Sequence, residues 1–315
     1  MNEPIVRLRG LTRRFGTLVA VDELSFEVGR GELFGLVGPD GAGKTTTLRM
    51  LAGVLPPSAG DAELAGESVV TAAERIKPRL AYMSQRFGLY ADLTVRENLE
   101  FYADLYEVPA VERAARRERL YRFSGLEPFA GRLAGKLSGG MKQKLGLSCA
   151  LVHQPEILLL DEPTFGVDPI SRRDLWLIVH EMVDQGVTAI VSTAYLDEAE
   201  RFDRLALLHR GRLLALDTPD ALQRDFPGAL LEVATERPRE AKAAAELLPE
   251  VRRVALFGDR LHVTVDSAAV APQLLGALRG QGFAAAAATP IPPSLEDVFL
   301  ERIASAEALA ERVER

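Results

Sequence analysis

The sequence predicts an α/β protein whose core is a parallel sheet covered by helices on both faces. Apolar runs typical of buried strands alternate with helical patterns, and these runs begin at Leu33, Ile157, Thr188 and Leu205. A glycine-rich segment follows the first run, and two acidic residues follow the second. Because ligands of open parallel sheets bind at the carboxyl ends of the strands, we expect these two segments to form one site.

The glycine-rich segment GPDGAGKTT begins at Gly38 and fits the phosphate-loop pattern G-x-x-x-x-G-K-[ST]. A predicted strand over 33–37 precedes it and a predicted helix over 46–51 follows it, so a glycine-rich turn without function is disfavoured. Glycines let backbone N–H groups turn toward phosphates, and the helix presents the positive end of its dipole there. We expect Lys44 to reach the β and γ phosphates and Thr45 to hold Mg²⁺. The nucleotide-binding residues predicted here are Gly38, Pro39, Asp40, Gly41, Ala42, Gly43, Lys44, Thr45 and Thr46.

The acidic pair ends the apolar run 157–160, which suits a central parallel strand. We expect Asp161 to bind the Mg²⁺ through water and Glu162 to orient and polarise the attacking water. Phosphoryl transfer depends mainly on a positioned nucleophile and on neutralised charge, and these two carboxylates suit those tasks. The alternative is a surface acid pair that caps a strand, which the phosphate loop upstream disfavours.

A third segment, LSGGMKQ, begins at Leu137 and opens a predicted helix over 141–152. It resembles the signature motif of ABC ATPases, and with the two segments above it identifies ATP as the nucleotide. The resemblance implies that Ser138, Gly139 and Gly140 of one subunit face the γ-phosphate of ATP held by another subunit. A serine and two glycines at the start of a helix suit an anion. An ordinary loop is the alternative for so short a motif.

Three further positions match the ABC ATPase pattern. The resemblance implies that Phe15 stacks on adenine, with core packing as the alternative. It also implies that Gln85 touches Mg²⁺ and senses the transporter subunit, with a solvent-facing glutamine as the alternative. Asp168 falls in the loop that crosses between paired subunits, with a plain turn before Pro169 as the alternative. The catalytic residues are then Lys44, Gln85 and Glu162, and the Mg²⁺ ligands are Thr45, Gln85 and Asp161.

Two positions depart from the family pattern. Ala194 occupies the place where the family usually carries a histidine, and an alanine side chain cannot donate a hydrogen bond to a γ-phosphate. Tyr195 is adjacent, but with a conventional backbone its side chain points elsewhere. Asp40 stands where asparagine is usual, and a carboxylate about 4 Å from a triphosphate costs on the order of 1 kcal/mol when well solvated. We expect ATP binding to persist and hydrolysis at this site to be slow.

Composition indicates an ordinary soluble protein with one large and one small domain, since the chain has 315 residues, 47% hydrophobic and 26% charged. Its net charge of −7 argues against a nucleic-acid groove, so no nucleic-acid partner is expected. The longest apolar runs fall short of the ~20 residues that span a bilayer, and the first residues lack a signal-peptide core. We therefore expect a cytoplasmic protein. Cys149 is expected in the core, and the histidine spacing indicates no metal site beyond Mg²⁺.

The predicted domains are 1–226, an ABC ATPase domain with a helical subdomain at about 86–152, and 227–315, an accessory domain. The accessory domain reads β-α-β-β-α-β, the split βαβ arrangement. Its predicted elements are strand 230–235, helix 239–248, strand 251–257, strand 261–265, helix 271–281, strand 283–288 and a terminal helix.

The phrase PPSLEDVFLERI, from Pro292, resembles the end of the accessory domain of ATPases that serve ABC-2-type exporters, the group that includes daunorubicin-type drug exporters. The fold class implied is an ABC-type P-loop ATPase domain, with a parallel core sheet, an antiparallel β subdomain and a helical subdomain, plus a small C-terminal α+β domain. A chain of this class without a membrane span needs a membrane partner.

The resemblance therefore implies the ATPase subunit of a bacterial ABC-2-type exporter, peripheral to the inner face of the cell membrane and bound to a separate permease. Two subunits would sandwich two ATP molecules, with Ser138 and Gly140 of one completing the site of the other. Residues 87–93 would contact the permease. Ala194 adds the hypothesis of a heterodimer in which a second ATPase subunit carries the missing histidine.

Two alternatives stay open. A non-transport ABC protein that acts on ribosomes or chromatin usually carries two motor units in one chain or a long coiled coil, and this chain has neither. The C-terminal domain is also a candidate for binding a regulatory small molecule. Because no polar cluster marks a site there, we expect a dimerising or bracing role instead.

Overall fold

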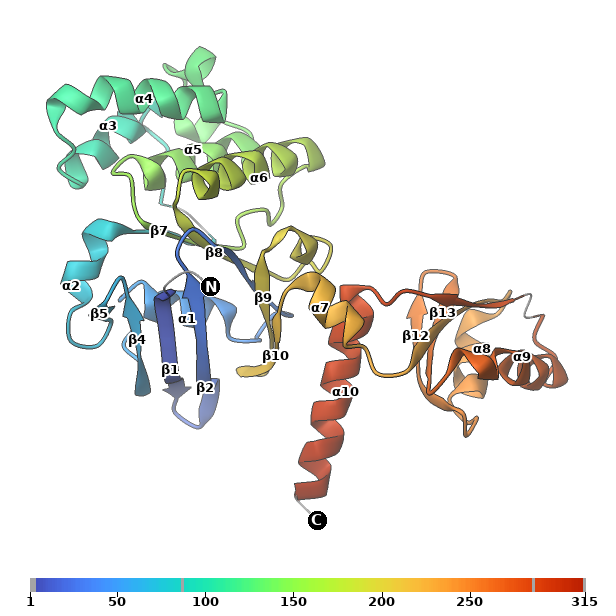
Figure 1. Ribbon diagram of the computed structural model, residues 1–315. Coiled ribbons are helices and arrows are strands. Elements are labelled where there is room, and N and C mark those ends of the chain that lie inside the picture. The colour runs from blue at the N-terminus through green and yellow to red at the C-terminus, as the bar shows by residue number, and fades with distance from the viewer. Residues whose placement is uncertain (1–3, 86–87, 285–286, 314–315) are drawn as a thin grey trace. The chain divides into compact units, whose positions relative to one another are not determined.

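The chain divides into two compact units, Met1–Leu216 and Asp217–Arg315, in a computed structural model that describes residues 4–85, 88–284 and 287–313 (Figure 1). The architecture is mixed α/β, as predicted. The division falls ten residues before the boundary expected at residue 226, because α7 (Pro219–Arg224) packs on α10 (Leu295–Val313) in the second unit. Among the described helices, none combines the length and the apolarity needed to cross a bilayer.

The centre of the first unit is a six-stranded sheet in the order β10-β9-β3-β8-β7-β6. The neighbouring strands from β9 to β6 run parallel, and every residue of β3, β7 and β8 is buried. The carboxyl ends of β3 and β7 therefore deliver the phosphate loop and the acidic pair to one edge of the sheet. The strands are β3 (Leu33–Val37), β6 (Leu80–Met83), β7 (Ile157–Asp161), β8 (Thr188–Thr193), β9 (Arg204–His209) and β10 (Arg212–Asp217).

A second, antiparallel sheet packs on the central sheet across a shared apolar core. Its order is β2-β1-β4-β5, and its first strands carry the long N-terminal hairpin. Phe26 of this sheet stacks on Phe34 of the central sheet with ring centroids 5.2 Å apart, so one apolar core serves both sheets. The elements are β1 (Pro4–Phe15), β2 (Leu18–Gly29), β4 (Ala59–Leu64), β5 (Glu67–Ser68) and α2 (Ala73–Ile76).

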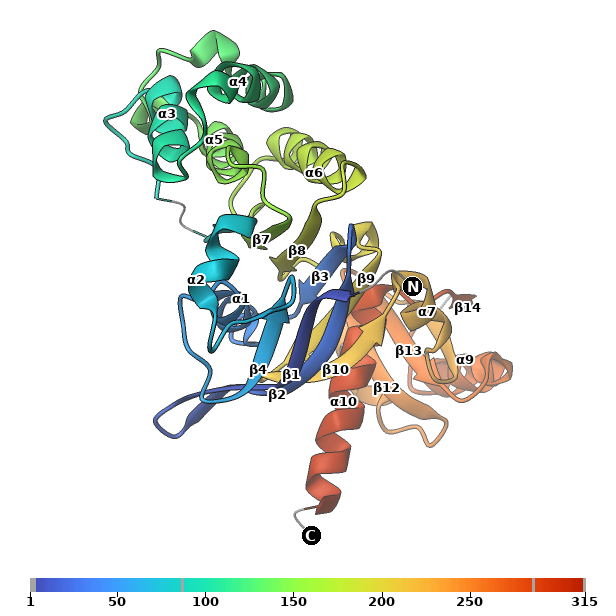
Figure 2. The ribbon, with the colours of Figure 1, turned by 60° about the vertical axis from the view of Figure 1, so that its left-hand side comes forward.

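Helices dominate between β6 and β7, where the sequence predicts a helical subdomain. They lie together with α6, next to β7 and β8 (Figure 2). Helix α5 begins at Gly139 instead of 141, because the Ser138 hydroxyl accepts a hydrogen bond from the backbone of Met141 at 3.3 Å and caps the helix two residues earlier. The α-helices of this segment are α3 (Val95–Leu105), α4 (Ala110–Ser124) and α5 (Gly139–Leu151). Helix α1 (Lys44–Leu51) follows the phosphate loop, and α6 (Pro169–Asp184) follows β7.

The second unit has the predicted βαββαβ order, with an antiparallel sheet in the order β12-β13-β11-β14. The buried carboxyl group of Asp297 ties α10 to this sheet, because it lies 2.8 Å from Nδ1 of His262 and accepts the Ser294 hydroxyl at 2.6 Å. The elements are β11 (Ala229–Ala234), α8 (Pro238–Ala245), β12 (Val251–Phe257), β13 (Arg260–Val265), α9 (Ala271–Gly280) and β14 (Ala288–Ile291).

The last strand lies at residues other than those predicted from the sequence. A strand was expected over 283–288, of which residues 285–286 lie outside the described part, and β14 instead spans Ala288–Ile291. Gly282 adopts a positive φ of 83°, and the backbone N–H of Phe283 donates to Leu278, so this segment ends α9. The pairing with β11 then falls on the stretch that contains β-branched residues.

Candidate functional site

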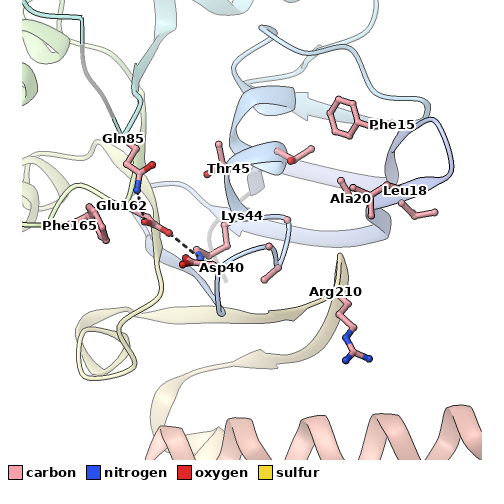
Figure 3. A pocket seen from close by; sticks show the side chains of 15 residues that line it. Phe15, Leu18, Ala20, Asp40, Lys44, Thr45, Gln85, Glu162, Phe165 and Arg210 are labelled. Atoms are coloured by element: carbon pink, nitrogen blue, oxygen red, sulfur yellow. Dashed lines mark hydrogen bonds and ion pairs between the residues drawn. The ribbon is translucent and has the colours of Figure 1, made fainter.

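A pocket of about 750 Å³ opens at the carboxyl edge of the central sheet (Figure 3). Ten of its lining residues were predicted from the sequence: Phe15, Asp40, Gly41, Ala42, Gly43, Lys44, Thr45, Thr46, Gln85 and Glu162. Five were not: Leu18, Val19, Ala20, Phe165 and Arg210. The predicted residues that do not line it are Gly38, Pro39, Ser138, Gly139, Gly140, Asp161 and Asp168.

The phosphate loop has the tight path that its glycines allow. A Cβ atom on Gly38 would lie 2.2 Å from the carbonyl oxygen of Leu208, and one on Gly43 would lie 2.6 Å from that of Ala20. Gly43 also has a φ of 100°, which an L side chain rarely adopts. Both positions therefore require glycine, and α1 begins directly after Gly43.

The side chain of Lys44 is almost completely buried, at 4% exposure. Its Nζ donates to the carbonyl oxygens of Gly38 at 2.7 Å and Pro39 at 3.1 Å, and it lies 3.1 Å from Oε1 of Glu162. Neutral carbonyls and one carboxylate thus hold the ammonium group at the base of the pocket. This is a point charge placed where phosphate oxygens would arrive.

The carboxylate of Asp161 accepts hydrogen bonds from three hydroxyl groups beside the phosphate loop. Its Oδ1 accepts from Thr45 at 2.9 Å and from Ser192 at 2.8 Å, and its Oδ2 accepts from Tyr82 at 3.4 Å. Burial, and secondly the neighbouring carboxylate, raise the pKa of the Tyr82 phenol, so this residue stays a neutral donor. The hydroxyl of α1 and the carboxylate of β7 form a set of oxygen atoms of the kind that Mg²⁺ prefers.

The carboxylate of Glu162 contacts both Lys44 of the phosphate loop and Gln85 on the other side of the pocket. Its Oε1 pairs with Lys44, and its Oε2 accepts from Nε2 of Gln85 at 3.0 Å (Figure 3). Its backbone has a positive φ of 47°, a conformation that costs about 1–3 kcal/mol for a residue with a side chain. Two hydrogen bonds from its N–H to Ser192, to Oγ at 3.0 Å and to the carbonyl at 3.2 Å, hold this conformation and aim the carboxylate into the pocket.

The segment with Ser138 and the loop with Asp168 meet outside the pocket. Asp168 caps α6 by accepting from the backbone of Ser171 at 3.0 Å, and this hydrogen bond lowers the pKa of its carboxyl group. A Cβ atom on Gly140 would lie 2.2 Å from the Ser171 hydroxyl, so only glycine lets α5 approach α6 this closely. Gly139 is exposed beside them.

The position of the expected histidine lies just beyond β8. Ala194 is exposed, and the backbone N–H of Tyr195 donates to Thr193 Oγ1 at 3.0 Å. The ring of Tyr195 faces the guanidinium group of Arg172, 4.8 Å away, and it does not line the pocket. Tyr195 therefore supplies no substitute donor in this geometry.

Phe165 and Arg210 line the pocket although the sequence did not predict them. Phe165 is 56% exposed. It lies three residues after Glu162, so its position near the acidic pair could have been predicted from the sequence. Arg210 lies far along the chain, in the turn between β9 and β10. The next residue, Gly211, donates to the carbonyl of Ala42 at 3.1 Å, and this long-range contact holds the turn beside the phosphate loop. Phe15 is 45% exposed and lies under the guanidinium of Arg13, so it does not pack in the core.

Family comparisons cover both units. The family described as ABC transporter matches residues 21–165, and the family described as ATP-binding protein DrrA1-3-like, C-terminal domain, matches residues 218–303. A solved structure described as the ATP-binding subunit of an ABC transporter is 31% identical, with a TM-score of 0.65 over 70% of this chain and 93% of that one. A dimeric ATP-binding cassette, MJ0796 bound to ADP and Pi, is 24% identical with a TM-score of 0.62, over 68% of this chain and 98% of that one, and shares the fold.

Curated relatives extend the similarity along nearly the whole chain. The probable multidrug ABC transporter ATP-binding protein YbhF of Escherichia coli is 43% identical over 97% of this chain, and the chain spans 53% of that relative's length. The Nod factor export ATP-binding protein I of Burkholderia thailandensis is 39% identical over 91% of this chain and 93% of its own length. The chain therefore belongs to the ABC transporter ATP-binding proteins and carries the DrrA1-3-like C-terminal domain.

Proposed function

We propose that this chain is the ATP-hydrolysing subunit of an ABC-2-type exporter and that it works through a separate membrane permease. The observation that carries the proposal is the continuous chain of contacts from Gln85 through Glu162 to Lys44 inside the nucleotide pocket. It combines a buried cation for the phosphates with a carboxylate aimed at the same space. The names of the relatives, which refer to multidrug and Nod factor export, support the direction of transport.

The residues of the pocket suit ATP in one orientation. The exposed ring of Phe15 would stack on adenine, and the phosphate loop with Lys44 would cradle the β and γ phosphates. The oxygen set of Thr45, Gln85 and, through water, Asp161 fits Mg²⁺, which would neutralise phosphate charge. Glu162 would orient the attacking water. Asp40, at the rim of the loop, adds a carboxylate that weakens ATP binding modestly.

A second ATPase subunit would complete this site. Ser138, Gly139, Gly140 and Asp168 lie outside the pocket of their own chain. Ser138, Gly139 and Asp168 are exposed and would face the pocket of a partner, while the buried Gly140 lets α5 lie close to α6 behind them. Because Ala194 lacks a donor for the γ-phosphate, we propose that the partner is a related subunit that carries the missing histidine. Closure of the pair around ATP would then move the permease, and hydrolysis would reopen it.

The permease would dock on a groove of about 320 Å³ beside Gln85, whose lining includes Leu89, Ala91 and Gln143. The buried side chain of Asn98 shapes this groove, because its amide donates to the carbonyls of Tyr90 at 3.1 Å and Leu93 at 3.2 Å. Phe87 was predicted to belong to the same surface and lies outside the described residues. Through this contact the chain would sit at the inner face of the cell membrane.

The relatives do not favour a role on ribosomes or chromatin, since they are named as transporter or export ATP-binding proteins. The accessory domain would brace or dimerise the assembly, in keeping with its compact βαββαβ core. No nucleic-acid partner is proposed.

Co-expression with the permease encoded beside this chain tests the proposal. The chain should move to the membrane fraction with the permease, and Leu89→Asp or Tyr90→Asp should weaken this association while ATP affinity stays native. Val111→Asp, on an exposed position of α4, is the matched control and should change neither quantity. Equal association of all these variants would exclude the groove, and no association of the native chain would exclude the permease.

A further inference from the structure

A buried carboxyl group lies behind the position of the missing histidine. Glu198 is 2% exposed, and its Oε2 accepts from the hydroxyls of Thr193 at 2.8 Å and Thr164 at 3.1 Å. Its Oε1 accepts from Nε1 of Trp176 at 3.3 Å, and Nε of Arg172 lies 3.7 Å from the same oxygen. Burying a carboxyl group without such partners would cost several kcal/mol, so this cluster has a defined geometry.

The four partners come from three separate segments. Thr193 ends β8, Thr164 follows the acidic pair, and Trp176 and Arg172 belong to α6, which Asp168 caps. Glu198 therefore connects the strand before Ala194, the loop after Glu162 and the helix that starts at the loop expected to cross between subunits.

Strand geometry links this cluster to the nucleotide pocket. Successive side chains of a strand point to opposite faces, so Ser192 and Thr193 act on different sides of β8. Ser192 holds Asp161 and the backbone of Glu162, whereas Thr193 holds Glu198. The backbone of β8 is thereby fixed from both sides immediately before Ala194.

We propose that Glu198 is a positioning residue for ATP hydrolysis, which fixes the loop of Glu162 and the start of α6 relative to the end of β8. It touches neither the pocket nor the phosphate loop, and it acts through Thr193, Thr164 and Trp176. Loss of its oxygens releases three buried donors at once, so the loop that carries Glu162 gains freedom. Misplacement of a catalytic group by about 1 Å is enough to lower a rate roughly 100-fold.

The experiment compares Glu198→Ala with Glu198→Gln and with Glu200→Ala, an exposed acid two residues along the chain. The full chain is kept in excess over ATP, with Mg²⁺ present. Hydrolysis of the bound ATP is followed through a single turnover over hours, so that a slow rate is still quantified. ATP affinity is titrated in parallel with a fluorescent ATP analogue. Glu198→Ala should lower the rate constant roughly 10- to 100-fold per folded molecule, with affinity within about twofold. The glutamine variant keeps an acceptor and should retain most of the rate, and Glu200→Ala should be native.

A matched pair at Thr193 covers the case in which Glu198→Ala does not fold. Thr193→Val removes the shortest hydrogen bond to Glu198, and Thr193→Ser keeps it. The valine variant should hydrolyse ATP more slowly with unchanged ATP affinity, and the serine variant should retain the native rate of hydrolysis. A native rate in folded Glu198→Ala, equal rates in the two Thr193 variants, or a loss in Glu198→Gln as large as in the alanine variant would overturn the proposal. The measurements do not need the permease, and if the native chain alone gives no measurable rate they are made with the second ATPase subunit present.

Discussion

The ammonium nitrogen of Lys44 lies 3.1 Å from a carboxylate oxygen of Glu162, so the phosphate loop and the end of β7 meet as a buried ion pair. Lys44 is buried and Glu162 is partly buried, and each has further partners, since Lys44 also contacts two carbonyls and Glu162 also accepts from Gln85. Such a pair is sensitive to the loss of one member, because the other is then left as a buried charge without its partner. The phosphates of ATP would enter at this contact.

Lys44→Ala should abolish ATP binding or nearly so, because it deletes the charge at the base of the phosphate cradle. A charged hydrogen bond contributes about 1.5–3 kcal/mol, so a single lost contact already predicts a roughly 10- to 150-fold weaker affinity. Titration with a fluorescent ATP analogue measures this, and Lys77→Ala, a half-exposed lysine paired with Glu74, is the control. Native affinity in the Lys44 variant would exclude the phosphate-loop assignment.

Ala194→His should increase ATP hydrolysis, because a histidine there regains a hydrogen-bond donor for the γ-phosphate. Steady-state turnover of the purified chain, alone and with a second ATPase subunit, measures the gain, and Ala194→Phe controls for ring size. If the native chain alone already hydrolyses ATP briskly and histidine adds nothing, the asymmetric pair is not needed. Activity that appears only with a second subunit would support it.

His153 should make the first unit less stable in acid. The imidazole ring stacks on the ring of Tyr106 with centroids 3.9 Å apart. Burial in this position lowers the pKa of the imidazole from 6.5 to about 4. The folded state therefore resists protonation while the unfolded chain accepts a proton near pH 6.5, so stability is complete above that pH and falls as the pH drops toward 4. Between pH 7 and 5 the loss should be roughly 1–2 kcal/mol.

Urea unfolding followed by the fluorescence of Trp176, the one tryptophan of the chain, measures this loss in the first unit. His153→Phe keeps an aromatic ring against Tyr106 and has no group that titrates, so its stability should change less between pH 7 and 5. An identical pH dependence in the native chain and in this variant would assign the acid loss to other groups.

Contiguous patterns made most of the first unit predictable. The phosphate loop, the acidic pair and the strands that carry them are local in sequence, and the parallel sheet follows from their alternation. The edge at which they meet then follows from strand direction, and these motifs supply eight of the ten predicted lining residues. The other two, Phe15 and Gln85, were predicted only from the resemblance to ABC ATPases.

The remaining differences depend on contacts between distant segments. Arg210 reaches the pocket because its turn bonds to the phosphate loop, and no local pattern near Arg210 signals that contact. The position of β14 depends on its register with β11, which a run of alanines does not specify. The unit boundary moved because α7 packs on α10, a helix far along the chain.

The central claim, that this chain binds and hydrolyses ATP in a closing pair, is tested most directly by Glu162→Gln. The variant loses the carboxylate that would orient water, while the phosphate cradle and Lys44 remain. Light scattering coupled to size-exclusion chromatography, with and without ATP and Mg²⁺, should show an ATP-dependent dimer that persists, and parallel assays should show binding near native with turnover lost. Turnover at the native rate, or failure to dimerise with ATP in the presence of the permease and of a second ATPase subunit, would contradict the account.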